Sequence, residues 1–148
     1  MNIAVLTVRQ PWATLLAHGI KKYETRSWRT IYRGPIAIHA SKTFDAESRH
    51  WALQTPEVCK LIAECGYRNA NELSLGGVLA IGTLTQRRWT HQIVDTISPI
   101  ERLLGDWSSG RWAWRLDDMR LLKAPVWLSG CPGIWHTELP DHLLEVQS

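Results

Sequence analysis

The apolar residues of this chain fall in short, strand-length runs at irregular spacings, and this pattern most limits the folds open to it. Each run is rich in β-branched residues and is bounded by Gly, Pro or polar residues, which is typical of buried strands. The runs are Ile3–Val8, Ile36–Ala40 and Val78–Leu84. A further segment, Arg111–Leu116, places Trp112, Trp114 and Leu116 on one face, as expected of a strand with one face turned inward.

Short helices are predicted between these strands. Pro11 and Gly19 bracket a segment in which Trp12, Leu15 and Leu16 share one helical face. Further helices are expected to begin at Ser41, Thr55 and Ser98. Strands and helices do not alternate regularly over Gly76–Trp135, which argues against a parallel α/β sheet. We therefore expect an α+β fold, a small mixed β-barrel with short flanking helices.

The C-terminal half gives fewer signals. Asp117-Asp118 is predicted to turn the chain into a strand over Met119–Trp127, in which Pro125 favours a strand end or an edge. The last dozen residues are polar, and we expect them to be partly mobile. The sequence contains no linker, repeat or low-complexity segment, so residues 1–148 are predicted to form one domain.

Composition narrows the class of protein. The net charge of +3 and the pI of about 8.9 are compatible with an anionic partner but do not require one. The three cysteines form no CxxC pair and read as free thiols in a reducing compartment, and the histidines show no metal-ligand spacing. The apolar N-terminus is too short for a signal peptide or a membrane span. We therefore expect a cytoplasmic monomer without a metal, cofactor or membrane contact.

The segment Arg9–His39 concentrates basic and aromatic side chains beyond what a core needs. Its cations are Arg9, Lys21, Lys22, Arg26, Arg29 and Arg33, its large rings are Trp12, Tyr23, Trp28 and Tyr32, and Glu24 lies in the middle. The whole chain has nine Trp against one Phe. Most of these Trp residues are expected in the core, but a protein that stacks nucleobases or cages a methylated group is also rich in Trp.

Two local patterns suggest how this segment binds a ligand. Read at period two, Lys22–Trp28 turns Thr25 to one side and, to the other, Lys22, Glu24, Arg26 and Trp28. This suits either a solvated strand face or a lined cleft. The helix that starts after Arg9 could hold a phosphate or carboxylate on its first free N–H groups, or could simply be solvated. Arg87-Arg88-Trp89 is expected at a strand end or in a loop. It is a candidate part of the binding face, and the alternative is an ordinary surface segment.

At this point the motifs resemble the activating-signal-cointegrator homology (ASCH) domain family. The matching pieces are RQPWA, GIKKYETRSW, RGPIAIHA, GGVLAIG, RWAWRL with LLKAPV, and GCPGIW, which follow one another in order over nearly the whole chain. Each piece alone is weak, but the core pattern G-x-K-x-x-E-x-R is distinctive.

The resemblance implies a fold similar to the pseudouridine synthase and archaeosine transglycosylase (PUA) domains, a small closed β-barrel with flanking helices. It also implies a cleft beside the barrel, lined by Trp12, Lys21, Glu24, Arg26 and Trp28. Related domains bind RNA or hold a modified base in an aromatic cage, and family members include nucleic-acid binders, proposed ribonucleases and an enzyme that hydrolyses acetylated cytidine. In that enzyme the Lys matching Lys21 is followed three residues later by a nucleophilic Thr, where this chain has Glu24.

Three functions follow from these patterns, and nucleic-acid binding, to RNA, DNA or a nucleotide, is the first. Its predicted binding residues are Arg9, Trp12, Lys21, Lys22, Glu24, Arg26, Trp28, Arg29 and Arg33. The cations would neutralise phosphates, a Trp would stack on a base, and Glu24 would accept from an exocyclic amine or hold a neighbouring cation. With about four to five phosphate contacts, non-specific dissociation constants of roughly 1 to 100 micromolar and a steep salt dependence are expected.

The alternatives are an enzyme and a protein-interaction domain. As a hydrolase acting on RNA or on an N-acylated cytidine nucleoside, the chain would use Glu24 as general base and Lys21 to stabilise developing negative charge. His39, at a nearby strand end, is a possible acid, although a buried or capping histidine is more usual. A Trp-rich surface that meets a protein partner is the third hypothesis, and it predicts binding that is insensitive to Lys21 and Arg26.

Overall fold

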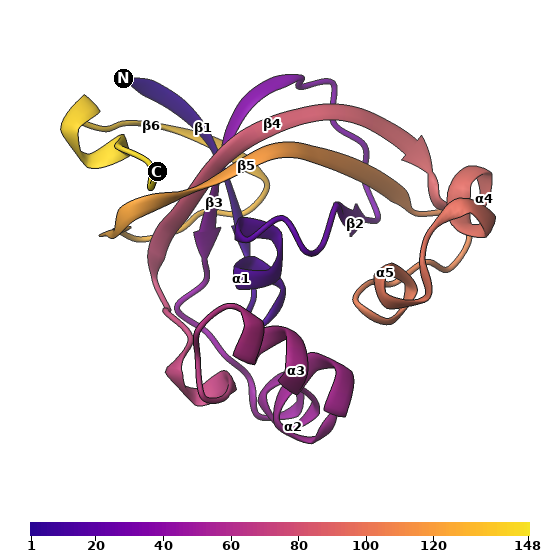
Figure 1. Cartoon of the computed structure of the whole chain (residues 1–148). Coiled ribbons are helices and arrows are strands. Elements are labelled where there is room, and N and C mark those ends of the chain that lie inside the picture. Colours follow the sequence, from indigo (N-terminus) through magenta and orange to yellow (C-terminus); the bar gives the residue numbers. More distant parts are fainter.

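A curled, six-stranded mixed sheet forms the body of the protein, as a computed structural model of residues 1–148 shows (Figure 1). Its strands are β1 (Asn2–Val8), β2 (Tyr23–Arg26), β3 (Gly34–Ala40), β4 (Gly77–Trp89), β5 (Trp112–Trp127) and β6 (Ile134–Glu138). Their order is β2-β5-β4-β3-β1-β6. Only β1 and β3 pair in parallel, because the chain crosses over between them through the first helix. The expected α+β barrel-like fold is confirmed, but the sheet ends at β2 and β6 and does not close.

The two longest strands, β4 and β5, run side by side and arch over the molecule. The turn predicted at Asp117-Asp118 is wrong, because β5 continues through it as one strand. Asp118 instead adopts a left-handed conformation with φ of 54°, and the register with β4 shifts at this point. Such bulges bend a strand without ending it. Arg87-Arg88-Trp89 forms the end of β4, as predicted.

The helices are short and lie at several places around the sheet (Figure 1). They are α1 (Trp12–Ala17), α2 (Ala46–Gln54), α3 (Pro56–Glu64), α4 (Thr90–Ile93) and α5 (Pro99–Leu103), with 3₁₀ turns η1 (Ala70–Glu72), η2 (Val94–Thr96) and η3 (Asp141–Leu144). The helix expected to begin at Ser41 begins only after Asp45, whose carboxylate accepts a hydrogen bond from the Ser48 backbone N–H at 2.7 Å. Asp45 is therefore the N-cap, and the residues before it form a loop.

The main core lies between α1 and the concave face of the sheet. Leu6, Leu16, Ile36 and Ile38 are fully buried there with Trp114. A second cluster, centred on Leu15, Val58 and Ile62, joins α1 to the helical layer of α2 and α3. Because α1 belongs to both clusters, the segments before and after it are fixed in place, and both contribute to the site described below.

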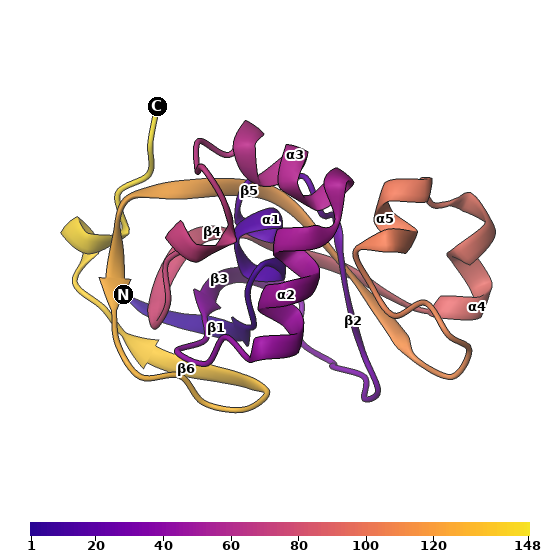
Figure 2. The ribbon, with the colours of Figure 1, turned by 90° about the horizontal axis from the view of Figure 1, so that it is seen from below.

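The C-terminal segment packs against the sheet. Leu139 and Leu144 are buried, and the backbone N–H of Lys123 donates to the carbonyl of Glu145 at 2.9 Å. Figure 2 shows this segment at the same side of the molecule as the N-terminus. The expectation of a partly mobile tail rested on its mostly polar composition. It did not take into account that the two leucines anchor the segment to the sheet. No helix has both the length and the apolar character that a membrane crossing would need.

Candidate functional site

A cavity of about 830 Å³ opens between the end of β1, the start of α1, strand β2 and the loop of residues 129–133. Five of the residues predicted to bind line it, namely Arg9, Trp12, Glu24, Arg26 and Trp28. It is large enough for a nucleotide-sized ligand. The structure thus brings together the middle of the basic segment, and the role of these residues in binding stays a prediction.

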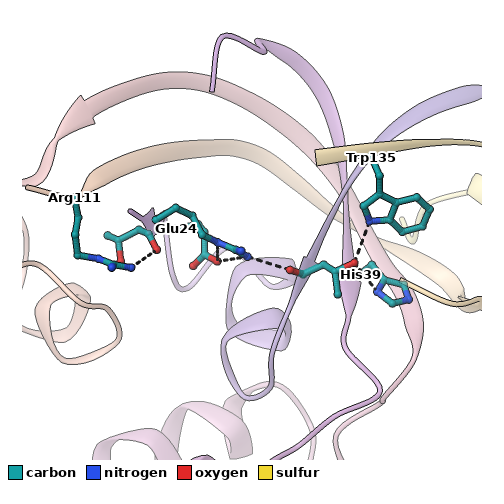
Figure 3. Close-up of polar contacts among 7 residues, drawn as sticks. Glu24, His39, Arg111 and Trp135 are labelled. Atoms are coloured by element: carbon teal, nitrogen blue, oxygen red, sulfur yellow. Dashed lines mark hydrogen bonds and ion pairs between the residues drawn. The ribbon is translucent and has the colours of Figure 1, made fainter. Parts of the chain in front are cut away.

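Strand β2 supplies the polar wall of the cavity. The Nε of Arg26 donates to Glu24 Oε2 at 2.9 Å, and Nη2 of Arg26 donates to the carbonyl of Thr7 at 3.0 Å (Figure 3). The Glu24 and Arg26 side chains are mostly buried, with 11% and 25% exposed. Arg26 is therefore held in one orientation by β1 and by Glu24, and only its remaining N–H groups are free for a ligand.

Arg111, which precedes β5, closes the other side of this wall. Its Nη2 donates to the carbonyl of Thr25 at 3.1 Å, and its Nε lies 3.5 Å from Asp106. Thr25 also lines this cavity. The sequence analysis placed Thr25 on the opposite face of the strand, and the structure does not separate it from the site. The polar contacts run continuously from Arg111 through β2 to Thr7 (Figure 3).

Two tryptophans form the aromatic walls. Trp12 stacks on Trp51 of α2, with ring centroids 5.6 Å apart and an interplanar angle of 22°. Trp28 meets the buried Trp114 edge-on, with centroids 4.7 Å apart, and 39% of Trp28 is exposed. Each ring is thus supported from behind by a second Trp, which makes both suitable as rigid contact surfaces for a planar ligand.

Lys21 lies in a second, smaller cavity of about 350 Å³ that shares Trp12, Glu24, Thr25 and Arg111 with the first. Only 1% of Lys21 is exposed, and its buried Nζ has no hydrogen-bond partner. Burial lowers the pKa of Lys21, and the charges of Glu24 and Glu101 oppose this effect. An amine that is buried without an acceptor is rare in a protein interior, so Lys21 stays a candidate for a functional role.

His39 of β3 sits at the far end of the large cavity. Its Nε2 lies 2.7 Å from the carbonyl of Leu128, which can only accept, so Nε2 carries the proton. Its Nδ1 accepts from Oγ1 of Thr7 at 3.2 Å, and the same Oγ1 accepts from Trp135 Nε1 at 3.0 Å. Burial is the main cause that lowers the pKa of His39. The ring is therefore a neutral, hydrogen-bonded part of the wall at neutral pH. This matches the expectation that a histidine at this position is buried or caps a strand end.

The rim carries two exposed cations. Arg9 is 64% exposed and lies 3.5 Å from Asp45, while Lys42 is exposed and forms no ion pair in the structure. At the start of α1, two of the N–H groups that the sequence offered to an anion have internal acceptors. The N–H of Ala13 donates to the Arg9 carbonyl and that of Thr14 to the Gln10 side chain at 3.0 Å, so these first-turn donors are already used.

Besides Lys21, three predicted binding residues lie outside the large cavity. Lys22 borders a separate pocket beside Glu101 and Arg115. Arg29 lines a shallow pocket on the outer side of Trp28. Arg33 donates to the carbonyl of Tyr32 at 2.7 Å and lines none of the pockets. β2 is only four residues long and begins after Lys22, so the period-two reading fails for Lys22, whereas Trp28 shares the cavity with Glu24 and Arg26.

Sequence reasoning missed several residues that line the cavity, chiefly Lys42, Arg111 and the loop Ser129–Gly133. These residues come from distant parts of the chain. Arg111 and Gly130–Gly133 belong to the pieces RWAWRL and GCPGIW, but the pieces themselves do not show that they meet β2. No group of three or more His, Cys, Asp or Glu side chains is arranged to hold a metal ion.

Comparison with known proteins places the chain in a family. A family model described as the ASCH domain matches residues 6–102. The chain belongs to the ASCH domain family. The match runs from β1 to α5 and includes the residues of β2 that line the cavity, whereas Arg111 and the loop 129–133 lie beyond it.

Two curated relatives share the name activating signal cointegrator 1. The mouse protein is 53% identical over 141 residues, which is 93% of this ASCH domain chain and 22% of the mouse protein. The human protein is 56% identical over 36 residues, or 24% of this chain and 6% of the human protein. The chain therefore spans less than a quarter of the length of these relatives.

Solved structures support the fold alone. Two crystal structures of mutant ZmASCH protein from Zymomonas mobilis each align with a TM-score of 0.51 at 14% sequence identity. Both cover 94% of this chain, and the chain covers 89% and 91% of them. The curled sheet with short helices is thus an architecture that other ASCH proteins share.

Proposed function

We propose that this ASCH domain binds a nucleotide, free or within RNA or DNA, in the large cavity. The observation that carries this proposal is the charge of the lining. Four cationic side chains, Arg9, Arg26, Lys42 and Arg111, face a single carboxylate, Glu24. Such a surplus of positive charge between low-dielectric walls attracts an anion, and the Trp12 and Trp28 rings suit an aromatic one.

The roles of the side chains follow from how each is held. Arg26 and Arg111 are fixed by backbone carbonyls, so they present their free N–H groups in defined directions. Arg9 and Lys42 at the rim are exposed and suit phosphate contacts. Glu24 can read a base edge, because a carboxylate accepts from an exocyclic amine, and Lys21 adds a positive charge beside it from the smaller cavity.

Fluorescence polarisation with labelled ten-residue RNA and DNA oligonucleotides at low salt tests this proposal. We expect Lys42→Gln to weaken binding about fivefold, the effect of one lost phosphate contact. The matched control is Lys60→Gln, because Lys60 is an exposed, unpaired lysine on α3 that lines none of the pockets. Absence of binding at low salt, or equal losses in the two variants, contradicts the proposal.

Hydrolysis of RNA or of an N-acylated cytidine is a second candidate, and the environment of Lys21 favours it. A buried amine with a lowered pKa is neutral more often than an exposed lysine, which suits proton transfer beside Glu24. Incubation with labelled RNA and with acylated cytidine should then show turnover that Lys21→Met and Glu24→Gln abolish. Turnover that survives both changes points to a contaminant, and its absence with both substrates rejects this candidate.

A further inference from the structure

Two arginines, Arg33 and Arg87, lie outside the cavity. Arg33 directly precedes β3, and Arg87 is near the end of β4. Arg87 of β4 holds its guanidinium carbon 5.3 Å from the centre of the Trp112 ring. Trp112 in turn stacks on Trp89, with centroids 3.8 Å apart and an interplanar angle of 28°. This stack fixes the direction of Arg87, so its guanidinium is preorganised for a planar or anionic partner.

Arg33 approaches Arg87 from the neighbouring strand. Gly34 pairs with Leu84 across β3 and β4, which places Arg33 beside the last residues of β4. Burial is the first cause that lowers the pKa of Arg33, and the positive charge of Arg87 is the second. The two guanidinium groups are therefore close enough to repel each other.

No carboxylate offsets this repulsion. Neither Arg33 nor Arg87 forms an ion pair, and the Nε of Arg87 is buried without a hydrogen-bond partner. Other arginines do have a counter-charge, as in Arg26–Glu24 and Arg68–Glu72. Two adjacent cations that lack a counter-charge are less stable than a paired arrangement, and an anionic ligand would relieve that repulsion.

Arg87 lies on the same face of the sheet as the cavity. Trp114 pairs with Glu24 on one side and with Arg87 on the other, and directly opposed residues project to the same face. Two strand spacings of about 4.8 Å separate Glu24 from Arg87, or roughly 10 Å, which is about three steps of a stacked nucleic-acid strand at 3.4 Å each. Trp28, whose ring rests on Trp114, lies between the two places.

We propose that Arg33 and Arg87 bind a phosphate of the same strand whose nucleotide occupies the cavity, so that the ligand is a single-stranded segment of RNA or DNA. This inference rests on the proposed function of the cavity and deepens it. A base that enters the cavity has left its stack, which excludes an intact duplex there. A free nucleotide fills the cavity but does not reach the arginine pair.

A length series of single-stranded oligonucleotides tests the inference by competition against a labelled strand. Strands of two, four, six and eight nucleotides should bind more tightly with length until both places are occupied. Arg33→Gln and Arg87→Gln should each remove about fivefold of this gain and leave dinucleotide affinity unchanged. Arg88→Gln is the matched control, because Arg88 adjoins Arg87 on β4, is exposed and unpaired, and points to the opposite face.

The outcomes separate this inference from the proposed function. Dinucleotide binding that depends on Lys42, together with a length gain that depends on Arg33 and Arg87, supports both. A length gain that persists in these two variants, an equal loss in Arg88→Gln, or a duplex that competes as well as the single strand overturns the inference and leaves the cavity proposal standing. Failure of every oligonucleotide to bind rejects the proposed function, and the inference with it.

Discussion

Lys21 is the residue whose environment fits least well with a purely structural role. Its Nζ is buried without an acceptor, although two carboxylates lie near enough to influence its pKa. Both are already engaged, since Glu24 accepts from Arg26 and Glu101 accepts from the backbone N–H groups of Lys22 and Tyr23. A buried donor without a partner destabilises the folded state, and binding sites are the usual places where such a loss is retained.

Replacing this amine should therefore stabilise the protein and weaken ligand binding. We expect Lys21→Met to raise the free energy of unfolding by about 1 to 2 kcal/mol at neutral pH, because it removes an unsatisfied buried donor and keeps the side-chain volume. Urea unfolding with Lys60→Met as the exposed control measures this difference. Oligonucleotide affinity should fall in Lys21→Met alone. A variant that is less stable than the wild type would show that Lys21 has a structural partner.

The pH dependence of stability gives an independent test of the same residue. Burial lowers the pKa of Lys21 below its ordinary 10.5, so between the lowered pKa and 10.5 the unfolded chain binds a proton that the folded chain has lost. The contribution of Lys21 to the free energy of unfolding of the wild type therefore rises with pH between these two pKa values. The difference in unfolding free energy between the wild type and Lys21→Met should shrink there, and a constant difference contradicts the assigned burial.

At the scale of elements, the site depends on β2, a four-residue strand at the edge of the sheet. Its outer side is tied to α5 by Glu101, whose two carboxylate oxygens each accept a backbone N–H of Lys22 or Tyr23 at 3.0 Å. Short edge strands are weakly held on their own. Glu101 thus acts as a clamp on the strand that carries Glu24 and Arg26.

Removing this clamp should loosen β2 before the rest of the sheet. We expect Glu101→Ala to lower the free energy of unfolding by about 2 to 4 kcal/mol, since it leaves two backbone donors without a charged acceptor. Hydrogen exchange should accelerate at the Lys22 and Tyr23 amides more than in β1 or β3. Glu64→Ala, an exposed change on α3, is the control. Uniform acceleration in all strands would show that Glu101 supports the whole fold instead.

The limits of the sequence analysis also lie at this scale. Local patterns predicted β1, β3 and α3 well, because their apolar runs and Pro or Gly ends act within a few residues. They did not predict that β5 passes through Asp118, since a bulge depends on the register with β4. They also missed Arg111, which joins the cavity only because β2 pairs with a strand about ninety residues away, as the contact between Arg111 and Thr25 shows.

At the scale of the whole molecule, the placement of charge matters more than its total. Lys and Arg exceed Asp and Glu by only three, and ion pairs such as Lys123–Glu145 neutralise charges far from the site. The unpaired cations Lys42, Arg33 and Arg87 lie at the cavity and beside it. Binding should therefore depend on local cations and not on the net charge.

Two double variants of equal net charge separate these possibilities. Lys42→Gln with Arg87→Gln, and Lys60→Gln with Arg120→Gln, each lower the net charge from +3 to +1. Each phosphate contact contributes about 0.7 to the slope of log affinity against log salt for a single strand, so the first pair should reduce the slope by about 1.4. The second pair should leave it unchanged, because Lys60 and Arg120 line none of the pockets. Equal slopes in the two double variants would mean that the strand is held by the average charge of the surface and that neither the cavity nor the arginine pair directs it.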